Sequence, residues 1–323
     1  MTMVLKPGRP GRPRRRWWRR EGVQGYVYIS PWLLGFLMFG VAPLIAAFLT
    51  SLSKANVFRT IRFVGLDNYQ KILTDDPVFA TIAGNMLIYV IGSTIISIGL
   101  GLALALLLHR DFRGNHVFRT LIYVPSLLVG IATAYLFKQV FQGGEVGLAN
   151  MFLGVFGAGP VNWLGNSEQP WLALVALILV NVWFAGGTML IFLAGLKGIP
   201  PAYFEAARVD GAGPWQMFRR VTLPLLSPVI VFNTIMALIG HIQVFETPLA
   251  FANNGGISTG NPLGYENSLG TFVTYLYVKG FVYQDMGYAS ALAFIMFAAT
   301  LVLTSLVLWF ARRFTAYGDS ERN

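Results

Sequence analysis

Six long apolar runs constrain the fold of this chain more than any other feature. They cover about residues 31–53, 83–109, 117–141, 170–195, 228–248 and 286–311, and each is long enough to cross a bilayer as a helix. Only 12% of the 323 residues are charged, and the mean hydropathy is +0.59, which argues against an ordinary soluble domain. The first run follows basic residues but is too long for a cleaved signal peptide, so we expect it to be retained. These runs predict an all-α integral membrane protein with six transmembrane helices.

The 24 Lys and Arg residues are distributed unevenly between alternate connections. Eighteen lie in the N-terminal tail up to residue 25, the 110–119 and 196–224 connections, and the tail from residue 312. The other six lie in 54–82, at Lys138 and at Lys279. Because short cytoplasmic loops are enriched in Lys and Arg, this division predicts that both termini are cytoplasmic. The net charge of +10 is then explained by orientation and by contact with anionic lipid, so we expect no nucleic-acid partner.

Three local patterns predict how the spans begin, bend and pack. Ser30 and Pro31 suit the N-cap and first turn of the first helix. Pro125 predicts a kink in the third span. A four-residue spacing of small side chains in the second span predicts a face that another helix approaches closely. That face consists of Ser93, Ser97, Gly101 and Ala105.

A polar insert at residues 200–228 separates the fourth and fifth spans. Pro200-Pro201 predicts the start of one short helix, and the glycines of 211–213 predict its end. Pro214 predicts a second short helix, and Pro224 and Pro228 are expected to close the insert. The pattern therefore predicts a helix–turn–helix knob just outside the membrane.

This insert resembles the EAA loop of ABC importer permeases, in which the loop docks on a cytosolic ATPase subunit. The positions that carry the resemblance are Glu205, Ala206, Ala207, Asp210, Gly211, Ala212, Phe218, Pro224 and Pro228. The resemblance implies that Asp210 and Gly211 shape the knob, that Glu205 supports docking by charge, and that Ala206 and Ala207 allow close approach. A loop that merely caps the bundle is the alternative interpretation.

Three further stretches resemble the first permease subunit of binding-protein-dependent carbohydrate importers of the maltose, glycerol-phosphate and multiple-sugar type. They are FVGLDNY at 63–69, FRTLIYVPSLL at 118–128 and GYASA at 287–291. The likeness covers about residues 26–312 and implies the type I ABC importer permease fold. Ile257 departs from it, because the family often has proline after the paired glycines.

The resemblance also implies a division of the chain. We expect a basic disordered cytoplasmic tail at 1–25, the first transmembrane helix with an extracytoplasmic segment at 26–82, and a cytoplasmic tail at 313–323. Residues 83–312 would form a five-helix permease core that carries the coupling loop at 200–228.

In maltose-type permeases the substrate pocket lies at mid-membrane on the helices that flank this loop. That likeness implies a substrate pathway through Asn181, Phe184, Gly187 and His241, with Ser126 and Thr133 as further candidates. Helix packing explains each residue equally well taken singly, and for His241 the alternative is a hydrogen bond between helices. Gln243 points about 200° away from His241 on a helix, so the two need not share a site. Glu246, near the outer end, is a gate or docking residue, or is simply solvated.

The chain has no phosphate-binding loop, no cysteine, only three histidines and no evident nucleophile–base pair, so we expect a transport subunit rather than an enzyme. The resemblance implies that partner subunits use ATP and Mg²⁺ and that this chain binds no cofactor. The implied partners are a second homologous permease, two ATPase subunits, an extracytoplasmic solute-binding protein, membrane lipid and a carbohydrate. An ion-coupled secondary transporter or channel is the alternative, although such proteins usually carry more ionisable residues at mid-membrane.

Overall fold

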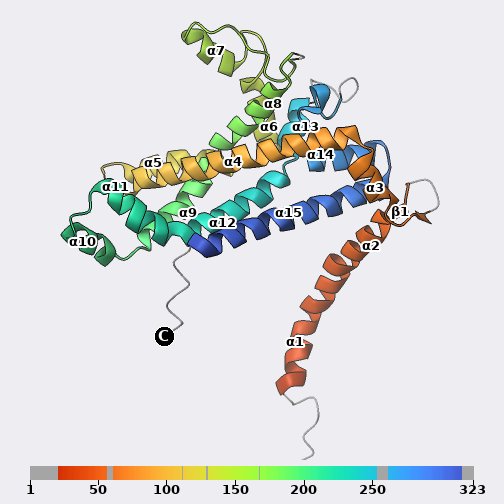
Figure 1. Ribbon diagram of the computed structural model, residues 1–323, viewed down its shortest axis with the longest axis horizontal. Helices are drawn as coiled ribbons and strands as arrows, with labels where there is room; N and C mark the ends of the chain where they lie inside the picture. Colours follow the sequence, from red (N-terminus) through yellow and green to blue (C-terminus); the bar gives the residue numbers. More distant parts are fainter. Residues whose placement is uncertain are drawn as a thin grey trace, which may run out of the picture. The chain divides into compact units, whose positions relative to one another are not determined.

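The computed structural model describes residues 21–56, 61–110, 112–128, 130–166, 168–252 and 261–314. Most of these residues are helical, and the chain divides into two compact units, Met1–Leu49 and Thr50–Asn323 (Figure 1). The basic N-terminal segment before residue 21 and the tail after residue 314 lie outside the described residues, as does Ile257.

The first unit is dominated by one long apolar helix. It is built from α1 (Glu21–Phe36), a π-helical turn η2 (Leu37–Val41) and α2 (Ala42–Ser51), the last of which ends in the second unit. The predicted start at Ser30 and Pro31 is wrong, because Pro31 lies inside α1. The Ser30 hydroxyl donates to the Val27 carbonyl at 2.8 Å. That carbonyl has no helical partner, since proline has no N–H to offer it, and the helix continues through the proline.

Long helices packed side by side form the centre of the second unit. They are α4 (Pro77–His109), α9 (Ala185–Lys197), α12 (Leu223–Ile242) and α15 (Met286–Phe314); α4 contacts α9 and α12, and α12 contacts α15 (Figure 1). Helix α4 begins at Pro77, earlier than residue 83, because the Asp76 carboxylate accepts the N–H groups of Val78 and Phe79 at 3.0 and 3.2 Å. This side-chain cap and the following proline determine where the helix starts.

Two of the predicted spans are bent. The helix formed by α5 (Asn115–Tyr123) and η3 (Val124–Leu127) makes an angle of 103° with α6 (Ile131–Val140), just after the expected kink at Pro125. The helix formed by α8 (Trp171–Leu179) and η4 (Val180–Val182) makes an angle of 45° with α9. By length and composition, the described residues contain four helices that could cross a membrane, or up to six spans if each bent pair counts as one.

The small-residue face of α4 packs against α9 as expected. Ser93, Ser97, Gly101 and Ala105 are all buried. A Cβ atom on Gly101 would lie only 2.7 Å from Cγ2 of Thr188 and 3.3 Å from the Met189 backbone nitrogen. Only glycine fits at this position, because the absence of a side chain on Gly101 lets the backbones of α4 and α9 approach each other closely.

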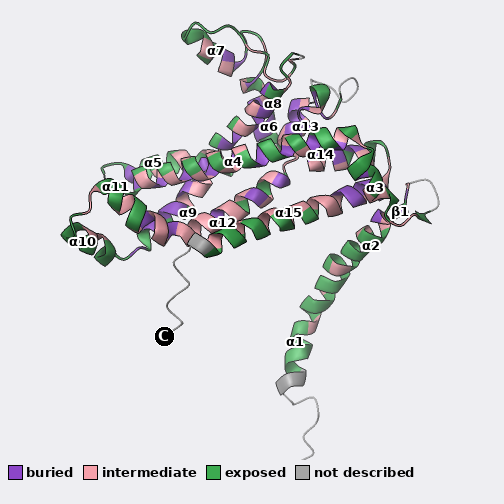
Figure 2. Cartoon of the chain, in the orientation of Figure 1, coloured by how far each residue is buried: buried purple, intermediate pink, exposed green. Residues whose placement is uncertain are grey.

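Shorter elements complete the second unit. They are β1 (Ser53–Lys54) paired antiparallel with β2 (Arg62–Phe63), α3 (Asp67–Thr74), α7 (Leu148–Val155), α10 (Pro201–Val209), α11 (Pro214–Met217), η5 (Phe218–Thr222), α13 (Glu246–Ala252), η6 (Tyr265–Asn267), α14 (Phe272–Tyr277) and η7 (Val278–Val282). Figure 2 shows buried residues in α4, α6 and α8, whereas α10 and α11 are largely exposed.

A polar cluster joins the start of α4 to α14 and α15. The second carboxylate oxygen of Asp76 accepts hydrogen bonds from the hydroxyls of Tyr275 and Tyr288. Nζ of Lys279 lies 4.7 Å from the ring centroid of Tyr288 and 5.1 Å from that of Tyr275. Burial by itself would raise the pKa of Asp76, but the two tyrosine hydrogen bonds, the Phe79 N–H and the Lys279 charge together lower the pKa below its usual value.

Candidate functional site: an exposed helical loop and a central cavity

The 200–228 loop contains the two short helices expected from the sequence, α10 and α11, separated by a tight turn. Gly211 has a φ of +77°, a left-handed conformation that costs other L-residues energy. Its N–H donates to the Arg208 carbonyl at 3.0 Å, and the Ala212 N–H donates to the Ala207 carbonyl at 2.9 Å. This pair of hydrogen bonds is a Schellman motif, which ends α10 and reverses the chain.

The surface of this loop carries large exposed apolar side chains among its charged ones. None of the residues of α10 or α11 is buried, and Val209 and Trp215 are 89% and 68% exposed. Among the residues implicated by resemblance, Glu205, Ala206, Asp210 and Gly211 are exposed, whereas Ala207, Ala212 and Phe218 are half-buried. Large exposed apolar side chains beside charged ones are typical of a protein–protein contact.

The expected end of the loop at Pro228 is wrong, because Pro228 lies inside α12, whereas Pro224 lies in the first turn of that helix. Helix α11 continues through η5 into α12 without a break, so one helical run extends from Pro214 to Ile242. Pro228 has no N–H to donate to the Pro224 carbonyl four residues earlier, and the Ser227 hydroxyl donates to that carbonyl at 2.7 Å instead. The second half of the loop is therefore continuous with the fifth span.

A central cavity of about 640 Å³ lies within the second unit. All six residues predicted for the substrate pathway line it, from three different spans: Ser126, Thr133, Asn181, Phe184, Gly187 and His241. The bends in the third and fourth spans place these residues there, since Ser126 lies in η3, Thr133 lies in the first turn of α6, and Phe184 and Gly187 adjoin the 45° bend.

Residues that sequence reasoning missed also line this cavity. Tyr89 comes from α4, Tyr123 from α5 and Asn233 from α12. Asn233 lies eight residues before His241, on the same face of α12, so helical spacing from His241 could have identified it. The tyrosines carry no comparable signal, because an aromatic residue in a span is usually explained by packing.

His241 is within hydrogen-bond distance of a neighbouring helix, which is the alternative role that the sequence allowed for it. Its Nδ1 is 3.2 Å from Oγ1 of Thr94, and its ring lies edge-on to the Tyr89 ring at 5.9 Å between centroids. The side chain therefore both packs against α4 and lines the cavity. Glu246 lines the cavity as well, because α12 ends at Ile242 and the chain restarts as α13. Gln243, expected to point elsewhere, is absent from the lining.

Asn181 stabilises the bend beside which the cavity forms. Its Nδ2 donates to Oγ of Ser93 on α4 at 3.0 Å and to the carbonyls of Leu177 and Ile178 at 3.3 and 3.1 Å. These bonds satisfy carbonyls at the end of α8 and tie α8 to α4. Ser126 acts similarly at the other bend, where its hydroxyl donates to the Tyr123 carbonyl at 2.7 Å.

The chemistry of the lining suits a ligand rich in hydroxyl groups. Aromatic rings, hydroxyls and amides line the cavity together with aliphatic side chains, and none of its described lining residues is Lys or Arg. Rings can stack on the C–H face of a sugar while amides and hydroxyls hydrogen-bond its hydroxyl groups. In the part of the chain that the structure describes, no three His, Asp or Glu side chains are close enough together to hold a metal ion.

Comparisons with known proteins agree with this architecture. The sequence pattern of the binding-protein-dependent transport system inner membrane component family matches residues 95–316. The probable ABC transporter permease protein YesP of Bacillus subtilis is 35% identical over 305 residues, which cover 94% of this chain and 95% of YesP. The arabinooligosaccharides transport system permease protein AraP of the same organism is 32% identical over 91% of this chain and 90% of AraP.

A solved structure shares the fold. A chain of a bacterial ABC transporter involved in the import of the acidic polysaccharide alginate superposes with a TM-score of 0.74 at 24% identity, over 90% of this chain and 96% of that one. The family match covers more than half of the sequence, and the similarity to YesP extends over nearly all of it. The chain is thus a multi-pass membrane transport component rather than an enzyme, and it belongs to the binding-protein-dependent transport system inner membrane component family.

Proposed function

We propose that this chain is the permease subunit of an ATP-driven importer that moves a carbohydrate through the central cavity across the cytoplasmic membrane. Relatives with carbohydrate names support the substrate class. Besides AraP, they include the trehalose/maltose permease MalF of Thermococcus litoralis at 32% identity and the lactose permease LacF of Rhizobium radiobacter at 30%. In this proposal six spans cross the membrane, both termini are cytoplasmic and the 200–228 loop faces the cytoplasm, as the distribution of Lys and Arg predicts.

The continuity of the loop with the cavity wall carries the proposal. Residues 214–242 form one helical run that begins in the exposed loop and then contributes Asn233 and His241 to the cavity, and the next helix, α13, adds Glu246. On the other side, α10 follows α9, which carries Gly187 and Thr188 of the lining, after a short connection. A displacement of the loop would therefore move two walls of the cavity as packed helices, which is how rigid elements transmit a conformational change.

The remaining partners follow from this arrangement. One chain supplies only part of a pathway, so a second homologous permease would complete it. Two ATPase subunits, which bind and hydrolyse ATP with Mg²⁺, would contact the two loops. A solute-binding protein would deliver the carbohydrate from outside; one solved structural relative is an alginate ABC transporter in complex with an alginate pentasaccharide-bound periplasmic protein.

Site-directed labelling tests the sidedness and the partner of the loop. Because the sequence has no cysteine, any introduced cysteine is unique in the chain. Val209→Cys places a thiol in the exposed loop, and Leu73→Cys places one on α3, where Leu73 is 65% exposed. We expect a membrane-impermeant maleimide added to intact cells to label the Leu73→Cys variant alone. A bifunctional cross-linker should join the Val209→Cys variant to the ATPase subunit. Labelling of the Val209→Cys variant from outside, or no cross-link in the assembled transporter, would refute the proposal.

A further inference from the structure

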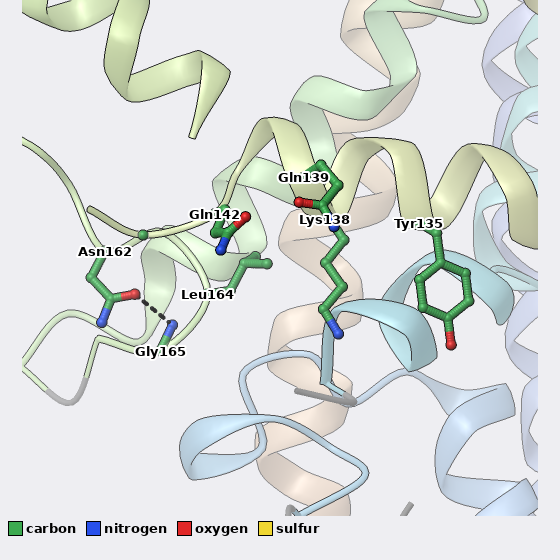
Figure 3. Close-up of a pocket in the computed structure, with 8 residues that line it drawn as sticks. Tyr135, Lys138, Gln139, Gln142, Asn162, Leu164 and Gly165 are labelled. Atoms are coloured by element: carbon green, nitrogen blue, oxygen red, sulfur yellow. Dashed lines mark hydrogen bonds between the residues drawn. The ribbon is translucent and has the colours of Figure 1, made fainter. Parts of the chain in front are cut away.

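A second cavity lies apart from the central one and shares none of its lining residues. It measures about 580 Å³, which is within the range of small-molecule sites. One wall is the end of α6, and the other is the loop that precedes α8 (Figure 3). We call it the α6–loop pocket. Its lining consists of Tyr135, Lys138, Gln139, Gln142, Gly143, Asn162, Leu164 and Gly165.

One buried asparagine holds the two walls of this pocket together. Asn150 of α7 is only 4% exposed. Its Nδ2 donates to the carbonyls of Gln142, Gly144 and Val161 at 3.3, 2.8 and 2.8 Å. Its Oδ1 accepts the Val161 N–H at 3.1 Å and Nε1–H of Trp163 at 2.9 Å. This network joins the end of α6 to the 161–165 segment, so the pocket is organised before any ligand arrives.

Side-chain amides dominate the recognition chemistry of the pocket. The amides of Gln139 and Gln142 make no hydrogen bond to any residue that the structure describes, and both side chains are exposed. Oδ1 of Asn162 accepts the Gly165 N–H at 3.2 Å, which leaves its amide N–H groups available (Figure 3). A primary amide presents a donor and an acceptor side by side, which matches two neighbouring hydroxyls of a sugar ring.

An aromatic ring and a cation complete the pocket. Tyr135 is 50% exposed, and Nζ of Lys138 lies 5.8 Å from its ring centroid. Figure 3 shows these two side chains extending next to each other from α6. None of the lining residues that the structure describes is Asp or Glu, so the pocket offers hydrogen-bond donors and a ring surface and has no carboxylate to attract a cationic ligand.

Helix α6 connects the two cavities. Thr133, at its start, lines the central cavity, whereas Gln139 and its neighbours line the α6–loop pocket. Gln139 follows Thr133 by six positions along the α-helix, which is a rise of about 9 Å. We propose that the α6–loop pocket is a second saccharide subsite, in which Gln139, Gln142 and Asn162 bind the hydroxyls of one sugar unit on the way into the central cavity. This inference rests on the proposed function.

Protection of a single cysteine by saccharide tests the subsite directly. A Cβ on Gly165 would meet only the Asn162 side chain, at 3.5 Å or more, so Gly165→Cys adds a reporter without a clash. In the complete reconstituted transporter without binding protein, maltotetraose, lactose or arabinotriose is added at high concentration, and the rate of maleimide modification is measured. We expect one of these saccharides to slow modification at least about threefold for the Gly165→Cys variant and to have no effect on the Leu73→Cys variant. Adding Gln139→Ala and Gln142→Ala to the reporter should abolish the protection.

Two controls separate the possible outcomes. Gln70→Ala, an exposed glutamine on α3, should leave the protection unchanged. If saccharide-free binding protein alone slows modification while saccharide does not, the pocket is a protein-docking surface and the inference is wrong. Uptake of the same saccharides is measured in the same proteoliposomes with binding protein present. Uptake without any protection overturns the subsite alone, whereas absence of uptake for every saccharide overturns the proposed function.

Discussion

The left-handed turn at Gly211 gives the most direct test of how the 200–228 loop works. Its φ is +77°, and a Cβ there would meet no heavy atom within 4 Å. Substitution by alanine therefore introduces no steric clash with the rest of the protein, and its cost comes only from the backbone conformation. An L-residue in this conformation costs about 1–2 kcal/mol, which lowers the population of the native turn about 5- to 30-fold.

Other substitutions at Gly211 should form a graded series. Asparagine adopts the left-handed conformation more readily, so Gly211→Asn should lie between the wild type and Gly211→Ala. Gly211→Pro forces φ to about −65° and removes the N–H that donates to the Arg208 carbonyl, so the turn cannot form. Gly213 is a matched control: its φ is −72°, and a Cβ there also meets nothing within 4 Å.

The assay is saccharide uptake and binding-protein-stimulated ATP hydrolysis by the reconstituted transporter. We expect activity to fall in the order glycine, asparagine, alanine, proline at position 211, with Gly213→Ala within about twofold of wild type since its conformation suits any residue. Membrane insertion, followed by the amount of full-length chain in the membrane fraction, should be unchanged in all variants. Wild-type transport by Gly211→Pro, or equal losses for Gly211→Ala and Gly213→Ala, would show that the shape of this turn is not needed for coupling.

Three further predictions concern the helix packing, the cavity and the polar cluster. Gly101→Ala should destabilise the protein by about 1–3 kcal/mol, measured as a lower melting temperature in detergent, because its Cβ overlaps Thr188, whereas Gly99→Ala, with open space around its Cβ, should not. His241→Leu should alter saccharide affinity or range, since the ring both lines the cavity and meets Thr94; unchanged uptake kinetics would leave it a packing role only. Asp76 has a lowered pKa in the folded state, so its stabilisation is complete above the ordinary carboxyl pKa of about 3.9 and is lost as the pH falls through the lower folded-state value. Asp76→Asn should therefore reduce stability at neutral pH and flatten its decline in acid, and an unchanged acid profile would contradict this role.

Local sequence chemistry predicted several elements of the fold. The two short helices of the 200–228 loop follow from prolines at their starts and a glycine in left-handed conformation between them. Each of these residues acts only on the backbone a few positions away, so the sequence alone predicts the result. The close face around Gly101 also follows from the small side chains of that face, whereas the bend of the third span lies between Leu127 and Ile131, after the expected position at Pro125. Family resemblance then identified six residues of the cavity lining, but it did not identify Tyr89, Tyr123 or Asn233.

Proline positions show where local rules failed. Pro31, with Ser30 before it, was expected to start a helix and Pro228 was expected to close the 200–228 loop, yet both prolines lie inside helices. A serine precedes each of these prolines, and its hydroxyl donates to the carbonyl four residues before the proline, so the helix continues with that carbonyl hydrogen-bonded. The sequence shows where the proline is. Whether the carbonyl four residues before it finds another hydrogen-bond donor depends on the conformation of nearby side chains.

The sequence by itself determined that this chain is a bundle of apolar helices with an exposed helical loop, because hydrophobic length and turn chemistry act locally. Only the tertiary structure decided which side chains share a site. Asp76 meets Tyr275 and Tyr288 from 199 and 212 residues away, and Asn150 joins the two walls of the α6–loop pocket. The physical reason is that helical periodicity sets the face on which a residue lies, whereas bends and close packing set what that face meets.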